Sequence, residues 1–119
     1  MDELTPAQQL ELREDLFALR DELNATVDGM TEEIKPVEPD AAIGRISRMD
    51  AIQIQQMAKA SMRTAKRRAQ QVAAALRRVA ADEYGECVAC GADIGYPRLK
   101  ARPESPFCLP CQSRRERGG

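Results

Sequence analysis

Hydrophobic positions near the start of the chain recur at the spacing of one face of an α-helix. Between residues 5 and 34 they follow one another at steps of three and four, which sum to an 11-residue period. They are Leu12, Leu16, Leu19, Leu23, Val27, Met30 and Ile34. Thr5, Pro6 and Gln8 match a capping box with a first-turn proline, and the prolines after residue 35 end the pattern. We therefore predict a helix over residues 5–34 whose single narrow stripe faces one partner helix.

The same stepping returns in the next third of the chain. The residues on this second stripe are mostly small: Ile54, Ala58, Ser61, Ala65, Ala69, Val72, Leu76 and Ala80. No proline or glycine occurs between Gly44 and Gly85, so a helix over about residues 43–83 is expected. Small residues facing Leu and Val allow close packing. We predict an antiparallel coiled-coil hairpin over residues 1–83, with its tip at about residues 35–50.

Charge is divided unevenly along the predicted hairpin. Residues 1–40 carry 12 acidic and 3 basic side chains, whereas residues 41–80 carry 1 acidic and 9 basic ones. Opposite charges of this kind favour packing of the two segments against each other over binding of nucleic acid. A six-residue turn puts residue i beside roughly residue 75 − i. The acids Glu11, Glu14 and Asp15 are then expected to face the bases Lys59, Arg63 and Lys66.

Composition limits the class of protein. The chain has 119 residues but only four aromatic side chains and no Trp, so a large globular core is not expected. The first twenty residues are acidic and lack an apolar segment of the signal-peptide kind, and no apolar run is long enough to cross a membrane. We expect a cytoplasmic protein without a membrane partner.

The four cysteines form two C-x2-C pairs, and 17 residues separate the pairs. The pairs are Cys87 with Cys90 and Cys108 with Cys111. Two such turns supply the four thiolates that a closed structural zinc site requires. Gly91 allows the chain to turn back after the first pair, and basic residues from Arg98 to Arg115 are near enough in sequence to offset the negative charge of the site. Two disulfides or a redox pair are the alternatives. Disulfides are not expected in a chain without a secretory signal, and a redox C-x2-C pair is not expected without a βαβ pattern.

The sequence around these cysteines resembles the C4 zinc finger of the DksA/TraR family. The resemblance rests on the runs 84–95 and 98–103 and on Cys108-Leu109-Pro110-Cys111, about a quarter of the chain. It implies an all-α protein in which a long antiparallel coiled-coil hairpin is followed by a four-cysteine finger over residues 84–119 with a short C-terminal helix. It also implies one structural zinc ion and binding to bacterial RNA polymerase through the secondary channel, with an effect on initiation.

Two regions depart from the pattern that the resemblance implies. Family members carry Asp-x-x-Asp-x-Ala at the coil tip, but here only Asp40 and Asp50 remain as acidic candidates for an effector tip. Arg102 matches an arginine that contacts ppGpp, whereas two expected lysines are Gln71 and Gln112. Weakened ppGpp binding is therefore expected.

Three classes of function are compared on these features. The chain has no His, no phosphate-binding glycine loop and no cysteine outside the metal set, so we do not expect an enzyme. A polymerase-binding regulator is the first hypothesis. The alternatives are a zinc finger that binds nucleic acid and a scaffold protein without a polymerase role. The finger segment carries six bases but also six acids, which lowers its expected affinity for phosphates.

Overall fold

The computed structural model describes residues 3–33 and 48–118, and most of them are helical. Four helices follow one another: α1 (Pro6–Glu33), α2 (Arg48–Ala80), α3 (Tyr96–Ala101) and α4 (Leu109–Arg117). Within these described ranges, β structure is limited to one bridge between Glu86 and Asp93. The prediction of an all-α chain with a small finger and a short C-terminal helix is confirmed.

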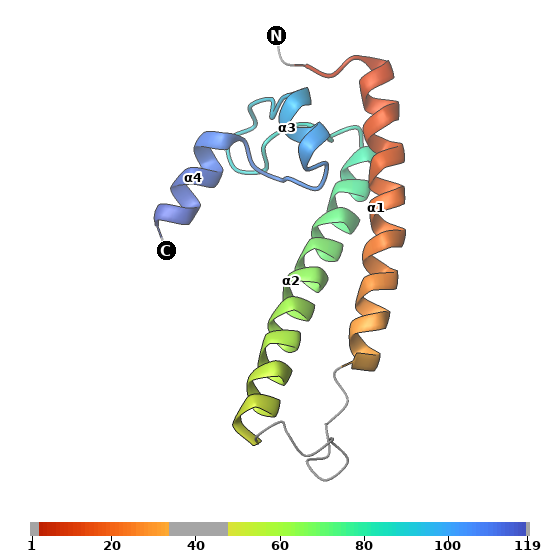
Figure 1. The fold of residues 1–119 in the computed structure, drawn as a ribbon. Coiled ribbons are helices and arrows are strands. Elements are labelled where there is room, and N and C mark those ends of the chain that lie inside the picture. The colour runs from red at the N-terminus through yellow and green to blue at the C-terminus, as the bar shows by residue number, and fades with distance from the viewer. Residues whose placement is uncertain (1–2, 34–47, 119) are drawn as a thin grey trace. The chain divides into compact units, whose positions relative to one another are not determined.

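The chain packs as two compact units. One comprises Met1–Asp21 and Gln70–Gly119, and the other comprises Glu22–Ala69. In each unit the segments of α1 and α2 run antiparallel, as predicted for the hairpin (Figure 1). The first unit holds the end of the hairpin together with the whole finger. The proposed domain boundary at residue 83 stays a prediction.

The start of α1 carries the expected capping box. The Gln8 amide donates to Thr5 Oγ1 at 3.1 Å, and the Thr5 amide donates to Gln8 Oε1 at 3.0 Å. These reciprocal bonds satisfy two backbone donors that have no partner inside the helix. The helix therefore begins where the sequence predicts, which places Leu12 and Leu16 on its buried face.

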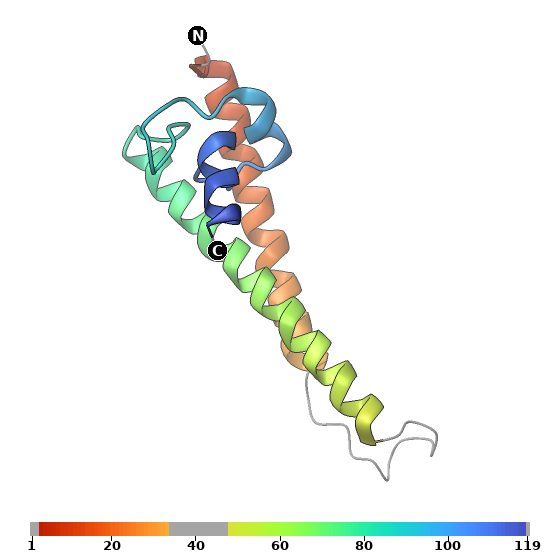
Figure 2. The ribbon, with the colours of Figure 1, turned by 90° about the vertical axis from the view of Figure 1, so that its left-hand side faces the viewer.

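The core of the first unit joins α1 to the finger. Leu4 and Leu12 pack with Leu99 of α3, and Tyr84, Ile94 and Tyr96 partly cover this cluster. Figure 2 shows α3 beside the first turns of α1. The finger is thus held to the hairpin by apolar packing as well as by the chain that connects them.

The predicted register of the hairpin is wrong. Phe17 was expected near residue 58, but it lines a cavity together with Leu76 and Val79. Glu11 and Asp15 pair with Lys100 of α3 rather than with the bases between Lys59 and Lys66. The predicted register assumed a six-residue turn, and the residues of that turn lie outside the described residues. A change in the connection between two antiparallel helices changes every pair along them.

In the part of the chain that the structure describes, no helix combines the length and the apolarity needed to cross a membrane.

Replacement of Leu12 by Ala tests the packing between α1 and the finger. Leu12 is fully buried, so Leu12→Ala is expected to lower the free energy of unfolding by about 2–5 kcal/mol. Leu10 on the same helix is 53% exposed, and Leu10→Ala should change it by less than about 1 kcal/mol. Urea unfolding followed by circular dichroism measures both. Equal effects of the two substitutions would contradict the packing described.

Candidate metal centre

The first cysteine pair lies on a tight turn held by backbone hydrogen bonds. The Cys87 amide donates to the Ala92 carbonyl at 2.7 Å, and the Gly91 amide donates to the Cys87 carbonyl at 2.9 Å. Gly91 has φ +78°, a left-handed conformation that glycine adopts without strain. A Cβ atom at Gly91 would meet no heavy atom within 4 Å, so backbone conformation rather than crowding favours glycine there.

The second pair lies at the start of α4. Cys108 is the N-cap residue and Cys111 follows in the first turn, where the Gln112 amide donates to the Cys108 carbonyl at 2.9 Å. Pro110 suits this position because the first residues of a helix have no intrahelical acceptor for their amides. A short helix thus presents both sulfurs from one turn. The short C-terminal helix expected from the sequence is thus α4, which begins before Cys111 and includes it.

The four sulfurs fit one tetrahedral zinc ion. All four Sγ atoms lie within 4.8 Å of one another, and those of Cys90 and Cys108 are 3.7 Å apart. Zinc–sulfur bonds of about 2.3 Å in a regular tetrahedron put the sulfurs about 3.8 Å apart, whereas a disulfide needs about 2.0 Å. All four cysteines are free thiols, which excludes the disulfide alternative in this structure. The chain therefore holds one structural zinc ion through Cys87, Cys90, Cys108 and Cys111.

The surroundings of the site act in opposite directions on two of the thiols. They lower the pKa of Cys87, whereas the hydrogen bond with the Cys108 side chain, followed by burial, raises the pKa of Cys111. Burial alone raises the pKa of Cys87, but backbone N–H groups of Cys108, Cys90 and Ala89 bond its sulfur and bring the pKa down to about 6. The Arg114 guanidinium donates to Cys111 Sγ at 3.4 Å. Of the bases that the sequence proposed to offset the site, Arg114 is the one with a described bond to a sulfur.

Three other bases of the finger have described partners within the first unit. Arg98 Nε donates to the Phe107 carbonyl at 3.1 Å, and the Arg115 guanidinium lies 4.4 Å from the centroid of the Phe107 ring. Lys100 Nζ bonds Asp15 on α1. Because these side chains support the fold, they form a poor phosphate-binding surface, and the nucleic-acid alternative is not favoured.

A polar link between α3 and α1 was missed by the sequence reasoning. Lys100 Nζ lies 2.7 Å from Glu11 Oε2 and 2.9 Å from Asp15 Oδ2, and the Tyr96 hydroxyl donates to Glu11 at 2.5 Å. Hydrogen bonds from Lys100 and then Tyr96 lower the pKa of Glu11, and those to Glu11 and Asp15 raise the pKa of Lys100. One feature of the sequence could have predicted α3, the helix that carries Tyr96 and Lys100. Pro97 suits the first turn of a helix, so a helix start at Tyr96 was foreseeable.

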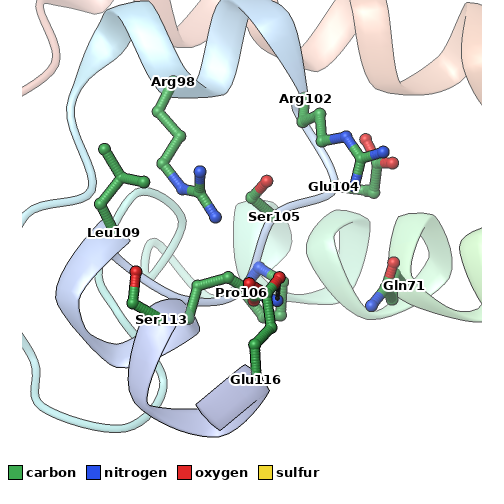
Figure 3. A pocket seen from close by; sticks show the side chains of 10 residues that line it. Gln71, Arg98, Arg102, Glu104, Ser105, Pro106, Leu109, Ser113 and Glu116 are labelled. Carbon is green, nitrogen blue, oxygen red and sulfur yellow. Dashed lines mark hydrogen bonds between the residues drawn. The ribbon is translucent and has the colours of Figure 1, made fainter.

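Arg102, the candidate ppGpp contact, lies beside a shallow cavity of the first unit. Arg98 and Arg102 of the α3 region, Gln71 of α2 and Glu116 of α4 surround this cavity (Figure 3). Glu104, which is 1% exposed, and Gln112 also line it. The structure therefore brings Arg102 together with the two glutamines that replace the expected lysines, in a lining with two arginines and two glutamates.

The two candidate effector residues are placed differently. Asp40 lies outside the described residues. Asp50 is exposed in the first turn of α2, where a carboxylate interacts favourably with the positive end of the helix dipole. Stabilisation of the helix start is thus one role for Asp50 that needs no partner protein.

The chain is similar to known zinc-finger proteins over its C-terminal third. The model of the prokaryotic dksA/traR C4-type zinc finger matches residues 82–117. The chain is 38% identical over 42 residues to the RNA polymerase-binding transcription factor DksA of Haemophilus influenzae, a stretch that covers 35% of this chain and 29% of the relative. It is 40% identical over 38 residues to the protein of the same name from Escherichia coli (strain K12), covering 32% of this chain and 25% of the relative. These matches span less than a third of the relatives' length.

A solved structure extends the likeness to nearly the whole chain. The transcription factor DksA2 from Pseudomonas aeruginosa superposes with a TM-score of 0.73 and 28% sequence identity. The superposition covers 94% of this chain and 85% of that one. The hairpin is therefore shared with this protein as well as the finger.

Removal of one zinc ligand tests the metal centre. Cys90→Ser is expected to abolish the single bound zinc and to loosen residues 84–117, because structural zinc contributes on the order of 10–16 kcal/mol in isolated fingers. Much of the helical circular dichroism of α1 and α2 should remain. Elemental analysis and hydrogen exchange measure the two effects. Val88→Ser, on the same turn but 58% exposed, is the control and should retain the metal. If wild-type protein purified under reducing conditions contains no zinc, the site is refuted.

The Lys100 link predicts a pH dependence of stability. The folded pKa of Glu11 is below its ordinary value, so its contribution is present above pH values of about 4.5 and is lost as the pH falls through the lowered pKa. Glu11→Gln should therefore be less stable than wild type at pH 7, and the difference should vanish in acid. Urea unfolding across this pH range measures it. Glu14→Gln, an exposed residue of the same helix, is the control and should show no such convergence.

Proposed function

Since the chain is a DksA-like member of the DksA/TraR zinc-finger proteins, we propose that it regulates transcription by binding bacterial RNA polymerase. The observation that carries this proposal is the likeness to DksA2 over 94% of the chain, which includes both hairpin and finger. The curated relatives are named as polymerase-binding factors, and the matched stretch covers less than a third of their length. In this proposal the chain acts in the cytoplasm by binding and not by catalysis.

The construction of the first unit suits such a role. Zinc organises the finger, and α3 attaches the finger to α1 through Leu99 and Lys100. Such a base holds the two helices in a fixed relation near the finger. The hairpin then enters the secondary channel of the polymerase, with the segment between α1 and α2 as its leading end.

The acidic residues of that leading end are the proposed effectors. A carboxylate near the catalytic Mg²⁺ of the polymerase alters the local electric field, which is a direct way to change initiation. Asp40 and Asp50 are the acidic side chains available for this role, one in the connecting segment and one at the start of α2. The proposal assigns binding to the helices and finger and the effect on initiation to these two residues.

The proposal also covers ppGpp, for which Arg102 is the candidate contact. The cavity beside Arg102 has neutral Gln71 and Gln112 and carries Glu104 and Glu116 besides its arginines. Polyanionic ligands gain from nearby cations and lose from nearby carboxylates. We therefore propose that ppGpp binds this chain weakly and that regulation does not depend on it.

Binding and transcription assays with core polymerase test the proposal. Wild-type protein should co-purify with bacterial core polymerase and change initiation at a sensitive promoter. The double substitution Asp40→Ala and Asp50→Ala should leave the dissociation constant within about threefold, because two exposed side chains contribute little to a large interface, yet abolish the effect on initiation.

Asp28→Ala on α1 is the matched control and should behave as wild type in both assays. Retention of the full transcriptional effect by the double variant would show that Asp40 and Asp50 serve the helix ends only. Failure of the wild-type protein to bind polymerase would refute the proposed function itself.

A further inference from the structure

A row of exposed cations lies on one side of α2 within the second compact unit. Lys59, Arg63, Lys66 and Arg67 form this α2 basic row, and all four are exposed. At 3.6 residues per turn they fall within an arc of about 100°, nearly opposite the buried Ala65. The row therefore faces away from the packed side of the helix.

The charge of the basic row is not neutralised within the described part of the chain. None of the four side chains has an ion pair among residues 3–33 and 48–118. The α2 sequence contains one acidic residue, Asp50, at its first turn. Of the acids of α1 that were expected to face these bases, Glu11 and Asp15 are instead bonded to Lys100. The expected self-neutralisation of the hairpin therefore does not extend to this face.

The basic row does not stabilise the helix that carries it. Lys59 with Arg63, and Arg63 with Arg67, are like charges at i and i+4, a spacing at which repulsion destabilises a helix. An anionic surface placed against the row would remove this repulsion. The arrangement thus has a cost in the free protein that a partner can relieve.

Apolar side chains continue the same face toward the start of α2. Met49 is 73% exposed and Ile52 is 46% exposed, and both lie on the arc of the basic row. The face therefore carries two exposed apolar side chains beside Arg48 near the start of α2, and the basic row further along. A partner that covers all of it needs carboxylates in a row and an apolar contact beside them.

We propose that this face of α2 docks against an acidic, partly apolar helical surface of the partner protein. The inference deepens the proposed function and rests on it, because the partner meant is RNA polymerase. The basic row steers the approach and sets the axial position of the hairpin, while Met49 and Ile52 bury against the apolar part.

A protein surface fits this face better than nucleic acid does. The α2 helix has no aromatic side chain on which a base can stack. Met49 and Ile52 gain nothing from contact with phosphates. The net charge of the chain is −1, with an acidic first third that repels an extended polyanion at long range. A local row of cations suits a short acidic helix that covers it alone.

Neutralisation of the row, compared with neutralisation elsewhere, tests the proposal. The variant K59Q/R63Q/R67Q keeps good helix formers and is compared with R13Q/R20Q/R117Q, which removes the same charge from other exposed positions. Dissociation constants for core polymerase are measured from about 50 to about 300 mM salt. Wild type and control should weaken with salt, whereas the row variant should bind at least about tenfold more weakly at low salt and respond less to salt. Ile52→Gln should weaken binding with the salt response unchanged.

Each outcome decides between the alternatives. If the row variant keeps wild-type helicity and binds polymerase as tightly as the control does, the docking surface is refuted and the proposed function stands. If it loses affinity for duplex DNA or for RNA but not for polymerase, the face is a nucleic-acid surface and the inference is wrong. If wild type and both variants all fail to bind polymerase, the proposed function fails and this inference fails with it.

Discussion

The structure depends on the attraction between one divalent cation and four thiolates. The finger has few apolar side chains of its own: Leu99 is its one fully buried large aliphatic residue, and that residue packs on α1. Hydrophobic burial of this extent does not order some thirty residues against their conformational entropy. Metal coordination supplies the missing free energy because it joins the turn at Cys87 to the start of α4.

The finger is connected to the hairpin through α3, which contacts α1. The zinc site fixes the segments before and after α3, because one pair of ligands lies on each side of this helix. Leu99 of α3 packs in the apolar cluster, and Lys100 pairs with the carboxylates of α1. Tyr84 reinforces the same connection, since its hydroxyl donates to the Pro103 carbonyl at 2.8 Å and its burial raises its pKa. The base of the hairpin and the finger therefore form one compact unit. Apolar packing stabilises the base of the hairpin, whereas metal coordination stabilises the finger.

Local patterns in the sequence predicted local structure well. The capping box at Thr5 and Gln8, the stripe on α1 and the four-cysteine cluster depend on residues close together in the chain, and each is present in the structure. The stripe predicted on α2 is present only in part, because Ala65 and Val72 are buried but Ile54 is exposed. The register of α1 on α2 and the partners of Glu11 depend on the length of the connection and on a contact 85 residues distant in sequence. Nothing in the spacing of apolar residues encodes such contacts, because a stripe of period 11 packs nearly as well when it slides by one period.

The position of Lys100 has a mechanical consequence. Glu11 and Asp15 are one helical turn apart, and Lys100 lies between them with bonds of similar length to each. Axial sliding of α1 past α3 in either direction lengthens one of these bonds, and rotation of α1 moves both carboxylates away from the ammonium group. The ion pairs of Lys100 with Glu11 and Asp15 therefore resist a force applied along α1. They connect α1 to the finger directly and not by way of α2 and the cysteine turns.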